Sequence, residues 1–583
     1  MRLLALLLEV WLLQVQRLHG ERAETTDGPG PPGSLVICRD LREPRRILRE
    51  GRDETANAND IREFLWPMPR TVTLQQQGRH VEDSELSGLQ PLRVDPCAMA
   101  FNLTGVPEDR AAVLWSLEHF CWRLCTAAEE TDSSEADSCR LNGSDGSDGS
   151  SGLAGLDVQM EKYQLLFAGV SKLSAASIHG FRRGLETLLQ VVDALSGSEG
   201  RSWTWAPGFT TNGAIPVDLW IEDVPKFPWR GLLLDTARHF APTEATDRNE
   251  LWYFRCSPAA SKLNVLHWHV TDAMSFPLQL ESLPQLAQLG SFGASKTYSH
   301  VDVRHIVALA ANLSIRVVPE LDMPAHTASW IFGEPETVSN CTHVLPHDPN
   351  DAKNRFKARD KLALDISSKR TKKVVSSILK EMAGLFPDEF FHVGGDEVDF
   401  RCWTTMPHIA AWMRKKGLGA SQALQHFFEH VFQEVKRLGK RPIVWQDAFD
   451  QGLRLPKEAV VQPWKCWGSV GKNLPGWPPL EPEAQIGHAA AFAATSQGFA
   501  TLQSSCWYLD WNSQWTDFYN HTADEGPLSS RPSDRLLGGE TALWSELIDF
   551  TNLNCRAWPR AAVVADACAS KSLLKGHLLP GIL

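Results

Sequence analysis

The amino-acid sequence predicts an α/β protein in which a C-terminal (β/α)8 barrel, of the TIM-barrel type, follows a smaller α/β domain. Eight short apolar, β-branched runs follow residue 226, and helix-like segments such as 374–385 and 423–435 lie between most of them. Each run ends in polar or aromatic residues, which is typical of barrel strands whose carboxyl ends form a site. The eight runs are 230–235, 263–272, 315–322, 390–397, 442–447, 460–464, 500–508 and 542–546.

An open, doubly wound sheet is the alternative for strands and helices that alternate in this way. No glycine-rich phosphate loop opens any of the predicted helices, which favours the barrel. One connection is unusual, because the gap between the fifth and sixth runs leaves little room for a full helix.

The chain begins with a segment that resembles a leader. Residues 1–20 combine an early Arg with an apolar run and end in Gly, which predicts a secretory signal peptide. No later stretch is apolar enough to cross a bilayer. Acceptor sequences for N-glycosylation indicate the same route, and we therefore expect a secreted or lysosomal protein. The acceptors are Asn102, Asn142, Asn312, Asn340 and Asn520.

Residues 35–215 are expected to form the smaller, non-catalytic domain, and residues 226–583 the barrel. The run at 163–170 predicts a strand, and apolar residues at helical spacing over 175–194 predict a helix. The stretch 131–152 is acidic and of low complexity, which indicates a solvated loop inserted in this domain.

Composition narrows the classes of partner. The net charge is −12 over 583 residues without a basic stripe, so nucleic acid is not expected as a partner. The chain holds 22 Trp against 5 Tyr, and an excess of Trp suits stacking on the flat apolar faces of sugars.

The 12 Cys are compatible with a few disulfides. For Cys121 and Cys125, a zinc site is the weaker hypothesis and a disulfide involving Cys97 the stronger.

The carboxyl ends of the eight runs supply acidic and aromatic residues with hardly a lysine. Because barrel active sites lie at these ends, we expect a neutral, hydroxyl-rich ligand, as a sugar is. The residues are Asp235, Asp272, Asp322, Asp396, Glu397, Trp445, Trp464, Tyr508, Trp544 and Glu546.

Nine stretches, in order from residue 65 to about 565, resemble β-N-acetylhexosaminidases of glycoside hydrolase family 20, of the eukaryotic lysosomal type. The resemblance implies an exo-acting, retaining hydrolase that removes terminal β-linked N-acetyl-D-hexosamine and needs no cofactor. The stretches are LWPMPR (65–70), RGLLLDTARHF (230–240), KLNVLHWHVTD (262–272), VVPELDMPAHTASW (317–330), FPDEFFHVGGDEVDFRCW (386–403), IVWQDAFD (443–450), WYLD (507–510), LGGETALWSE (537–546) and NCRAWPRA (554–561).

The resemblance also implies a role for individual residues. Glu397 matches the general acid/base, Asp396 the group that holds the 2-acetamido group of the substrate, and Tyr508 a donor to the acetamido oxygen. The remaining matches are aromatic walls, at Trp445, Trp464 and Trp544; contacts to ring hydroxyls, at Arg230, Asp510 and Glu546; residues around the acid, at Asp272, Asp322 and His326; and a disulfide between Cys341 and Cys402. Cys256, Cys466 and Cys506 are expected to be buried thiols.

The adjacent carboxylates Asp396 and Glu397 fit a reaction in which the substrate supplies its own nucleophile. In substrate-assisted glycosidases the acetamido oxygen attacks the anomeric carbon and forms an oxazolinium ion, so one protein acid and one neighbouring anion suffice. Repulsion between the two is expected to keep Glu397 protonated while Asp396 stays ionised. Gly394 and Gly395 would let both side chains face the site. The alternative, metal ligation by His392, Asp396 and Glu397, lacks a second His cluster, so no metal is expected.

The sequence departs from the family pattern at a few positions. Ala273 and Ala325 replace an Asp and a Gly, and Trp511 stands where members that accept anionic sugars carry Arg, which favours neutral GlcNAc or GalNAc ends. The usual continuation after residue 570 is missing, so we expect a shortened C-terminal end. The resemblance implies a homodimer. Two alternatives remain open: a non-catalytic sugar-binding homologue and an N-acetylglucosaminidase specific for chitooligosaccharides.

Overall fold

A computed structural model describes the barrel more fully than the N-terminal part. The described residues are 34–36, 71–76, 79–80, 91–93, 100–102, 116, 157–167, 172–196, 214–216, 218–242, 261–341, 362–466, 487–520, 535–549 and 551–569. The predicted signal peptide, the inserted loop 131–152 and the cysteines Cys97, Cys121, Cys125 and Cys256 lie outside these residues.

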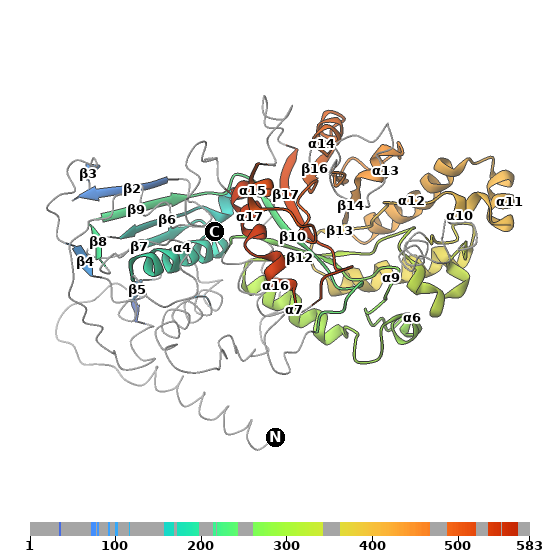
Figure 1. Ribbon diagram of the computed structural model, residues 1–583, viewed down its shortest axis with the longest axis horizontal. Helices are drawn as coiled ribbons and strands as arrows, with labels where there is room; N and C mark the ends of the chain where they lie inside the picture. The colour runs from blue at the N-terminus through green and yellow to red at the C-terminus, as the bar shows by residue number, and fades with distance from the viewer. Residues whose placement is uncertain are drawn as a thin grey trace, which may run out of the picture.

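The C-terminal part is a closed barrel of eight parallel strands (Figure 1). Each strand pairs with the next in sequence, and β10 also pairs with β17, so that Leu232 lies opposite Thr541. The predicted (β/α)8 barrel is confirmed, and each of the eight predicted runs overlaps one strand. The strands are β10 (Trp229–Asp235), β11 (Val265–His269), β12 (Arg316–Glu320), β13 (Phe390–His392), β14 (Arg441–Trp445), β15 (Val460–Gln462), β16 (Ala500–Gln503) and β17 (Leu536–Leu543).

Burial explains why these strands are nearly continuous apolar runs. All residues of β10, β12, β13 and β15 are buried, because helices cover the outside of the barrel and side chains fill its centre. The inner apolar layer includes Trp229, Val265, Val318 and Phe390. These residues close the amino-terminal end of the barrel, and the polar strand ends are left at the other side.

The helices between the strands carry one apolar face each. In α12 (Ala420–Arg437) the buried Leu424, Phe427, Phe428, Val431 and Val435 recur at helical spacing. The predicted helical segments 374–385 and 423–435 lie within α9 (Lys369–Leu385) and α12. The other helices of this part are α6 (Pro284–Gly290), α7 (His300–Asn312), η5 (Ala328–Phe332), η6 (Pro335–Thr337), α10 (Arg401–Thr404), α11 (Pro407–Lys416), α13 (Gln446–Asp450), α14 (Gly487–Ser496), α15 (Trp515–Asn520), α16 (Leu553–Ala557) and α17 (Arg560–Ala569).

The connection between the fifth and sixth barrel strands, β14 and β15, is short, as the sequence predicted. Only the five-residue α13 lies between β14 and β15, and its first turn comes directly after Trp445. The chain therefore holds Trp445 and the residues of α13 close to the carboxyl end of β15.

The N-terminal part contains a five-stranded antiparallel sheet in the order β3-β2-β9-β6-β7 beside α4 (Ile178–Ser196) (Figure 1). The predicted strand at 163–170 and helix at 175–194 correspond to β6 and α4, while the predicted domain boundaries stay predictions. The strands of the sheet are β2 (Thr71–Gln76), β3 (Arg79–His80), β6 (Tyr163–Phe167), β7 (Lys172–Ala175) and β9 (Asp218–Asp223). Two further pairs are β1 (Ser34–Val36) with β5 (Ala100–Asn102) and β4 (Pro91–Arg93) with β8 (Ala214–Pro216).

A buried ionic network joins this sheet to the amino-terminal end of the barrel. Glu161, at the end of η4 (Val158–Glu161), accepts hydrogen bonds from Arg183, Arg230 and Asn264. These two arginines outweigh the effect of burial, which alone would raise the pKa of Glu161, and lower it to about 2. The domain contact therefore depends on an ionised carboxylate.

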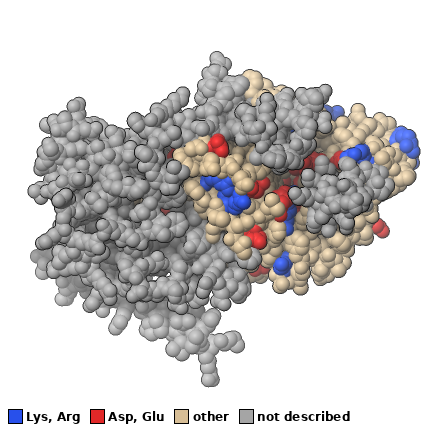
Figure 2. All heavy atoms as spheres, in the orientation of Figure 1, with Lys and Arg blue, Asp and Glu red and all other residues tan. Residues whose placement is uncertain are grey.

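Neither the charges on the described surface nor the positions of the acceptor asparagines indicate a particular partner. Acidic and basic side chains are interspersed on the described part of the face seen in Figure 2. Asn340 is exposed and Asn312 is half-buried at the end of α7; Asn102 and Asn520 end β5 and α15, and Asn142 lies outside the described residues. Glycosylation at these positions stays a prediction. No helix in the described ranges is both long and apolar enough to cross a membrane.

Candidate active site

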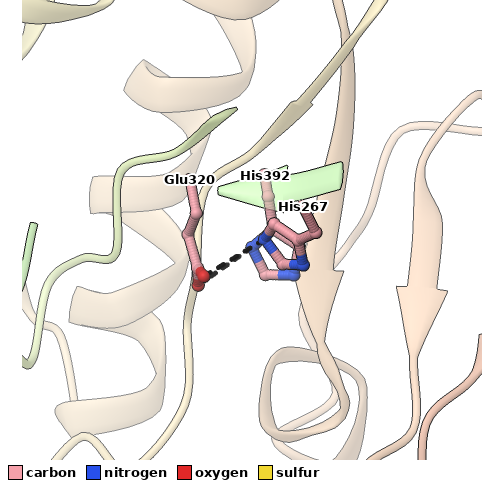
Figure 3. Close-up of side chains that lie close together, drawn as sticks. All are labelled: His267, Glu320 and His392. Carbon is pink, nitrogen blue, oxygen red and sulfur yellow. Dashed lines mark ion pairs between the residues drawn. The ribbon is translucent and has the colours of Figure 1, made fainter. Parts of the chain in front are cut away.

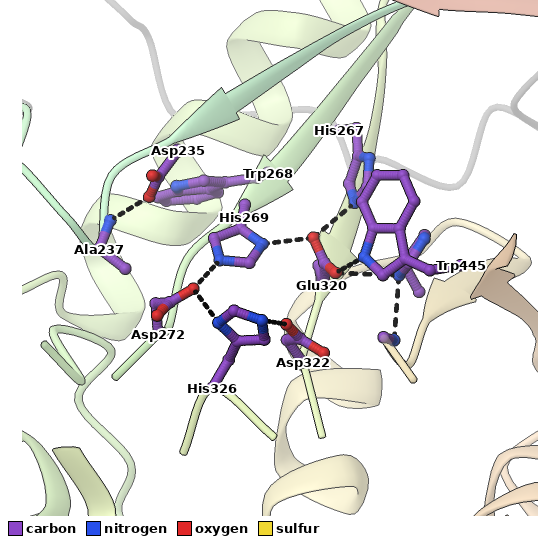
Figure 4. A network of polar contacts seen from close by, with 12 residues as sticks. Asp235, Ala237, His267, Trp268, His269, Asp272, Glu320, Asp322, His326 and Trp445 are labelled. Carbon is purple, nitrogen blue, oxygen red and sulfur yellow. Dashed lines mark hydrogen bonds and ion pairs between the residues drawn. The ribbon is translucent and has the colours of Figure 1, made fainter. Parts of the chain in front are cut away.

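The candidate active site gathers at the carboxyl ends of the barrel strands, around the imidazole of His326 (Figure 4). Its Nδ1 lies 3.5 Å from Asp272 Oδ2, and its Nε2 lies 3.5 Å from Glu397 Oε2, 3.7 Å from Asp396 Oδ2 and 4.0 Å from Asp322 Oδ2. One ring thus touches the two adjacent carboxylates and the two acids that were expected around them.

The backbone after β13 is shaped so that the adjacent carboxylates can both approach His326. Gly394, Gly395 and Glu397 have φ values of 68°, 106° and 49°. A Cβ on Gly394 would lie 1.7 Å from Asp322 Oδ1, so no other residue fits at this position. Asp396 is half-buried, and Glu397, whose side chain is 39% exposed, lies nearer to solvent. The expected role of the two glycines therefore has a structural basis.

The charges in this cluster differ from the sequence expectation. Burial and the neighbouring Asp322 raise the pKa of Asp396 well above its usual range, and burial raises the pKa of Asp322 to about 7. These directions run against the expectation that Asp396 is the readily ionised partner, since Asp322 adds a third acid to the cluster. Burial alone would lower the pKa of His326, but Asp272, Asp322 and Asp396 raise it well above its usual range. Positive charge on this ring offsets part of the repulsion.

Arg238 is a functional candidate that the sequence reasoning missed. It lies three residues after β10 and forms ion pairs with Asp235 and Asp272, both at 3.0 Å, and with Glu546 at 3.4 Å. Its guanidinium also lies 5.0 Å from the centroid of the Trp544 ring. Asp235 fixes this arrangement, since it also accepts the backbone N–H groups of Ala237 and Arg238. The sequence did carry a signal, an Arg just beyond the first predicted strand.

Arg230 was assigned to the wrong end of the barrel. It is the second residue of β10, and its side chain binds the backbone oxygens of Phe227 and Lys262, both at 2.8 Å, and the carboxylate of Glu161. Residues at the start of a barrel strand lie opposite the site that forms at the strand ends. The proposed contact between Arg230 and a ring hydroxyl is therefore excluded, and the residue belongs to the domain contact.

The expected aromatic residues do come together. Trp445 and Tyr508 pack in one buried cluster, with the half-buried Trp464 and Trp544 against it. Trp445 and Trp544 have ring centroids 5.9 Å apart, and the Tyr508 hydroxyl donates to the backbone oxygen of Trp464 at 3.1 Å. The rings of Tyr508 and Trp511 stack with centroids 4.7 Å apart. These rings provide an apolar wall beside the carboxylate cluster.

Asp510 follows this wall and is poised to bind polar groups. Its Oδ1 is buried and accepts no hydrogen bond within the described part of the chain. Burial, together with the carboxylate of Glu546, raises the pKa of Asp510 to about 8. A buried carboxyl oxygen without a partner costs free energy in the absence of a ligand, and a hydroxyl group of the ligand could satisfy it.

Asp447 is a further acid of the site, and like Arg238 it was missed by the sequence reasoning. It belongs to α13 and accepts the indole N–H of Trp464 at 2.7 Å, while Lys465 Nζ lies 3.2 Å from its other oxygen. Burial raises the pKa of Asp447, with Lys465 and Trp464 acting in the opposite direction. The short fifth connection places this pair beside the carboxylates.

Two disulfides lie near the site. The expected pair Cys341 and Cys402 is bonded, with Cα atoms 5.0 Å apart. The expectation that Cys466 and Cys506 are thiols is wrong, because they form a second disulfide with Cα atoms 4.8 Å apart. They are 40 residues apart in sequence, and only the adjacency of β15 and β16 in the barrel brings them together.

A column of buried polar residues fills the barrel beneath the site. His267 Nδ1 lies 2.6 Å from Glu540 Oε1. Its Nε2 lies 3.2 Å from Glu320 Oε2, and His392 Nδ1 lies 3.2 Å from Glu320 Oε1 (Figure 3). Glu320 also contacts His269, which in turn lies 2.9 Å from Asp272 (Figure 4). The carboxylates of Glu540 and Glu320 outweigh burial and raise the pKa of His267 to about 9.

Some of these residues have the donor types of a metal site. Three sets have ligand atoms within 4.8 Å of one another, namely His267 with Glu320 and His392, His269 with Asp272 and Asp322, and Asp322 with His326 and Asp396. Hydrogen bonds and ion pairs among the residues of this column and cluster account for their position, so the geometry gives no separate reason for a metal.

The two alanine replacements are accommodated. Ala273 and Ala325 are both fully buried, and the backbone N–H of Ala273 donates to Asp272 Oδ1. Ala325 precedes His326, whose φ of 57° is unusual for a residue other than Gly. Asp272 and His326 remain in contact despite both replacements.

Comparison with known proteins agrees with this geometry. Residues 227–571 match the model of the glycosyl hydrolase family 20 catalytic domain. The chain is 34% identical over 418 residues to the β-hexosaminidase subunit A1 of Dictyostelium discoideum, which covers 70% of this chain and 69% of the relative. It is 34% identical over 415 residues to the mouse β-hexosaminidase subunit beta, covering 70% and 68%.

Solved structures share the fold. A chitobiase from Flavobacterium johnsoniae superimposes with a TM-score of 0.65 at 25% identity, covering 87% of this chain and 69% of that one. The N-acetyl-β-hexosaminidase of Streptomyces plicatus, solved with Thio-NAglucal, gives a TM-score of 0.59 at 23% identity, covering 88% and 91%.

Proposed function

Because this chain belongs to glycosyl hydrolase family 20 and is a β-N-acetylhexosaminidase, we propose that the cluster around His326 is its catalytic centre, with Glu397 as the general acid/base and Asp396 as the acetamido-binding group. The enzyme removes terminal β-linked N-acetylhexosamine from the ends of glycans. The observation that carries the assignment of roles is the contact of both adjacent carboxyls with one imidazole, at 3.5 and 3.7 Å.

The proposed reaction needs no nucleophile from the protein. Glu397, the more exposed carboxyl, gives its proton to the glycosidic oxygen as the bond to the anomeric carbon breaks. The carbonyl oxygen of the substrate's acetamido group forms a new bond to that carbon and gives an oxazolinium ion. Water then attacks the same carbon as its bond to the acetamido oxygen breaks, Glu397 takes a proton from that water, and the two inversions leave the configuration retained.

Asp396 stabilises the intermediate in this proposal. As the ring closes, positive charge develops on the acetamido nitrogen, and a carboxylate that accepts its N–H lowers the energy of the charged state. Asp396 must therefore be ionised when substrate is bound, although burial and the neighbouring Asp322 raise its pKa in the ligand-free protein. The positive charge of His326, whose Nε2 lies 3.7 Å from Asp396 Oδ2, favours this ionisation.

The remaining contacts follow from the position of each group. Trp445, Trp464 and Trp544 would enclose the sugar ring and the acetamido methyl, with Tyr508 donating to the acetamido oxygen. Asp510 and Glu546 would accept hydrogen bonds from ring hydroxyls. Arg238, which pairs with Glu546, takes the role that the resemblance implied for Arg230. Trp511, stacked on Tyr508, carries no charge, which favours neutral GlcNAc or GalNAc.

Hydrolysis of a chromogenic β-N-acetylglucosaminide tests this function directly. Glu397→Gln should lower kcat by about 10³-fold or more while folding normally, because the leaving oxygen loses its proton donor. Glu336→Gln, the same change on the exposed η6, is the matched control and should leave kcat unchanged. Full activity of Glu397→Gln would refute the role of this residue, and an inactive wild-type protein would favour the non-catalytic, sugar-binding alternative.

We also propose that the enzyme travels through the secretory route to a lysosome or the cell exterior and forms a homodimer. The leader-like residues 1–20 and the acceptor asparagines support the route. A mobility shift after treatment with an N-glycosidase, and the mass from light scattering of the purified protein, test the two parts separately.

A further inference from the structure

The disulfide between Cys466 and Cys506 occupies a particular place relative to the proposed site. Cys466 follows Trp464 by two residues, and Cys506 precedes Tyr508 by two. One covalent bond thus links the two short segments that carry the aromatic groups proposed to face the acetamido end of the substrate.

The first of these segments, 464–466, is anchored to α13. The backbone N–H groups of Trp464 and Lys465 donate to Gln446 Oε1 at 3.3 and 3.2 Å. The indole N–H of Trp464 binds Asp447, and Lys465 Nζ lies 3.2 Å from Asp447 and 2.8 Å from Asp450. All of these contacts are made with the fifth connection of the barrel, and none of them reaches β16.

The second segment, 506–508, is anchored to β17. The backbone N–H of Ala542 donates to the oxygen of Trp507, and Leu509 donates to the oxygen of Ala542, both at 2.8 Å. Cys506 itself has a φ of 66°, a conformation that a residue with a side chain adopts only when its surroundings enforce it. The disulfide is a constraint of that kind.

Side-chain packing and hydrogen bonds also connect the two segments and the residues next to them. The Tyr508 hydroxyl donates to Trp464 O at 3.1 Å, and the backbone N–H of Ser504 donates to Pro463 O at 3.0 Å. In the proposed reaction the Tyr508 hydroxyl must turn from Trp464 O towards the acetamido oxygen, so that first hydrogen bond is lost when substrate binds. The disulfide is then the covalent contact that, together with the hydrogen bond from Ser504 to Pro463, keeps the two segments at a fixed separation.

We propose that the Cys466–Cys506 disulfide is a positioning element for catalysis, which holds Trp464 and Tyr508 at the separation that directs the acetamido oxygen towards the anomeric carbon. This inference rests on the proposed function and adds two positioning residues to it. Substrate participation depends on near-attack geometry, in which a displacement of about 1 Å can lower the rate by about 10²-fold. Removal of the bond should therefore affect the cyclisation step more than the binding of the sugar.

The test compares the double variant Cys466→Ala/Cys506→Ala with Cys341→Ala/Cys402→Ala, which removes the other buried disulfide. Both are assayed on chromogenic substrates whose acetamido methyl carries zero to three fluorines. Fluorine weakens the acetamido oxygen as a nucleophile, so the decline of log kcat/KM along the series measures substrate participation. We expect the Cys466/Cys506 variant to lose about 10-fold or more in kcat, with a smaller change in KM and a shallower decline than wild type. The Cys341/Cys402 variant should keep the wild-type decline, whatever its stability.

Two further measurements keep the proposal testable if the variant does not fold. Peptide mapping of the oxidised wild-type protein should show Cys466 joined to Cys506. In graded dithiothreitol, each equivalent of which supplies two electrons and two protons and becomes a cyclic disulfide, the loss of kcat should follow the fraction of this bond that is reduced. Free thiols at both positions, an unchanged decline in the folded variant, or full kcat after reduction would each overturn the inference. An inactive wild-type enzyme would instead overturn the proposed function.

Discussion

Replacing Glu161 by Gln should weaken the contact between the N-terminal sheet and the barrel. The change keeps the size of the side chain and removes the charge that Arg183 and Arg230 surround. Lowering the pKa of Glu161 from 4.5 to about 2 corresponds to about 3 kcal/mol of preferential stabilisation of the ionised, folded state. We therefore expect the free energy of unfolding at pH 7 to fall by about 3 kcal/mol, because two buried guanidinium groups lose their counter-ion.

The pH dependence has a definite sign. Because the folded protein lowers this pKa, the contribution is fully present above pH 4.5 and is lost as the pH falls from 4.5 through 2. The difference between wild type and Glu161→Gln should therefore be constant from pH 7 to pH 5 and begin to shrink below that.

Urea unfolding, followed by tryptophan fluorescence, measures this difference. Glu222→Gln is the matched control, since Glu222 of β9 pairs with Lys162, the residue after Glu161, but both side chains are partly exposed, at 25% and 39%. An exposed pair of this kind contributes about 0–1 kcal/mol. A loss in Glu161→Gln no larger than that of the control, or one that grows as the pH falls from 5 to 4, would refute the electrostatic account of the domain contact.

Three further predictions concern the site. Arg238→Met should lower kcat/KM by about 10²-fold or more, whereas Arg230→Met should lower the midpoint of urea unfolding with kcat/KM of the folded enzyme within about twofold of wild type; the opposite pattern would restore Arg230 to the site. Asp322→Asn should move the acid limb of the kcat/KM–pH profile to lower pH, since it removes a charge that raises the pKa of Asp396, and a shift to higher pH would contradict the assigned coupling. Gly394→Ala should abolish activity and lower stability by more than about 2 kcal/mol, because its Cβ would meet Asp322 Oδ1, and wild-type unfolding would show that the loop can relax.

Periodicity predicted the barrel because a strand that is buried on both faces appears in the sequence as an apolar run, here followed by polar residues. The same pattern placed Asp396, Glu397 and Trp445 correctly, since they come directly after such runs. The resemblance assigned the contact to Arg230 and not to Arg238, which lies eight residues later, and the apolar pattern does not tell which of the two faces the site. The orientation of an Arg depends on which carboxylates surround it, and these come from Glu161 and Asp272, far away in sequence.

Two other features were beyond local inference. The disulfide between Cys466 and Cys506 follows from strand adjacency, which sequence spacing does not encode. The raised pKa of Asp396 follows from its burial and from the approach of Asp322 over Gly394, a contact between the ends of β12 and β13. Both depend on tertiary distances of a few ångströms. The sequence could show that Asp396 and Glu397 lie side by side, because the two residues are joined by a peptide bond.

The polar column in the barrel has a consequence for protein engineering. Glu540, His267, Glu320, His269 and Asp272 form an unbroken series of contacts from the interior of the scaffold to the reacting groups. Replacement of these interior residues by aliphatic side chains would remove the contacts that hold Asp272 in place. His326 and Arg238, which Asp272 contacts, would then lose their position. Transfer of this active site to another barrel therefore requires the buried polar residues of the interior as well as the residues at the carboxyl ends of the strands.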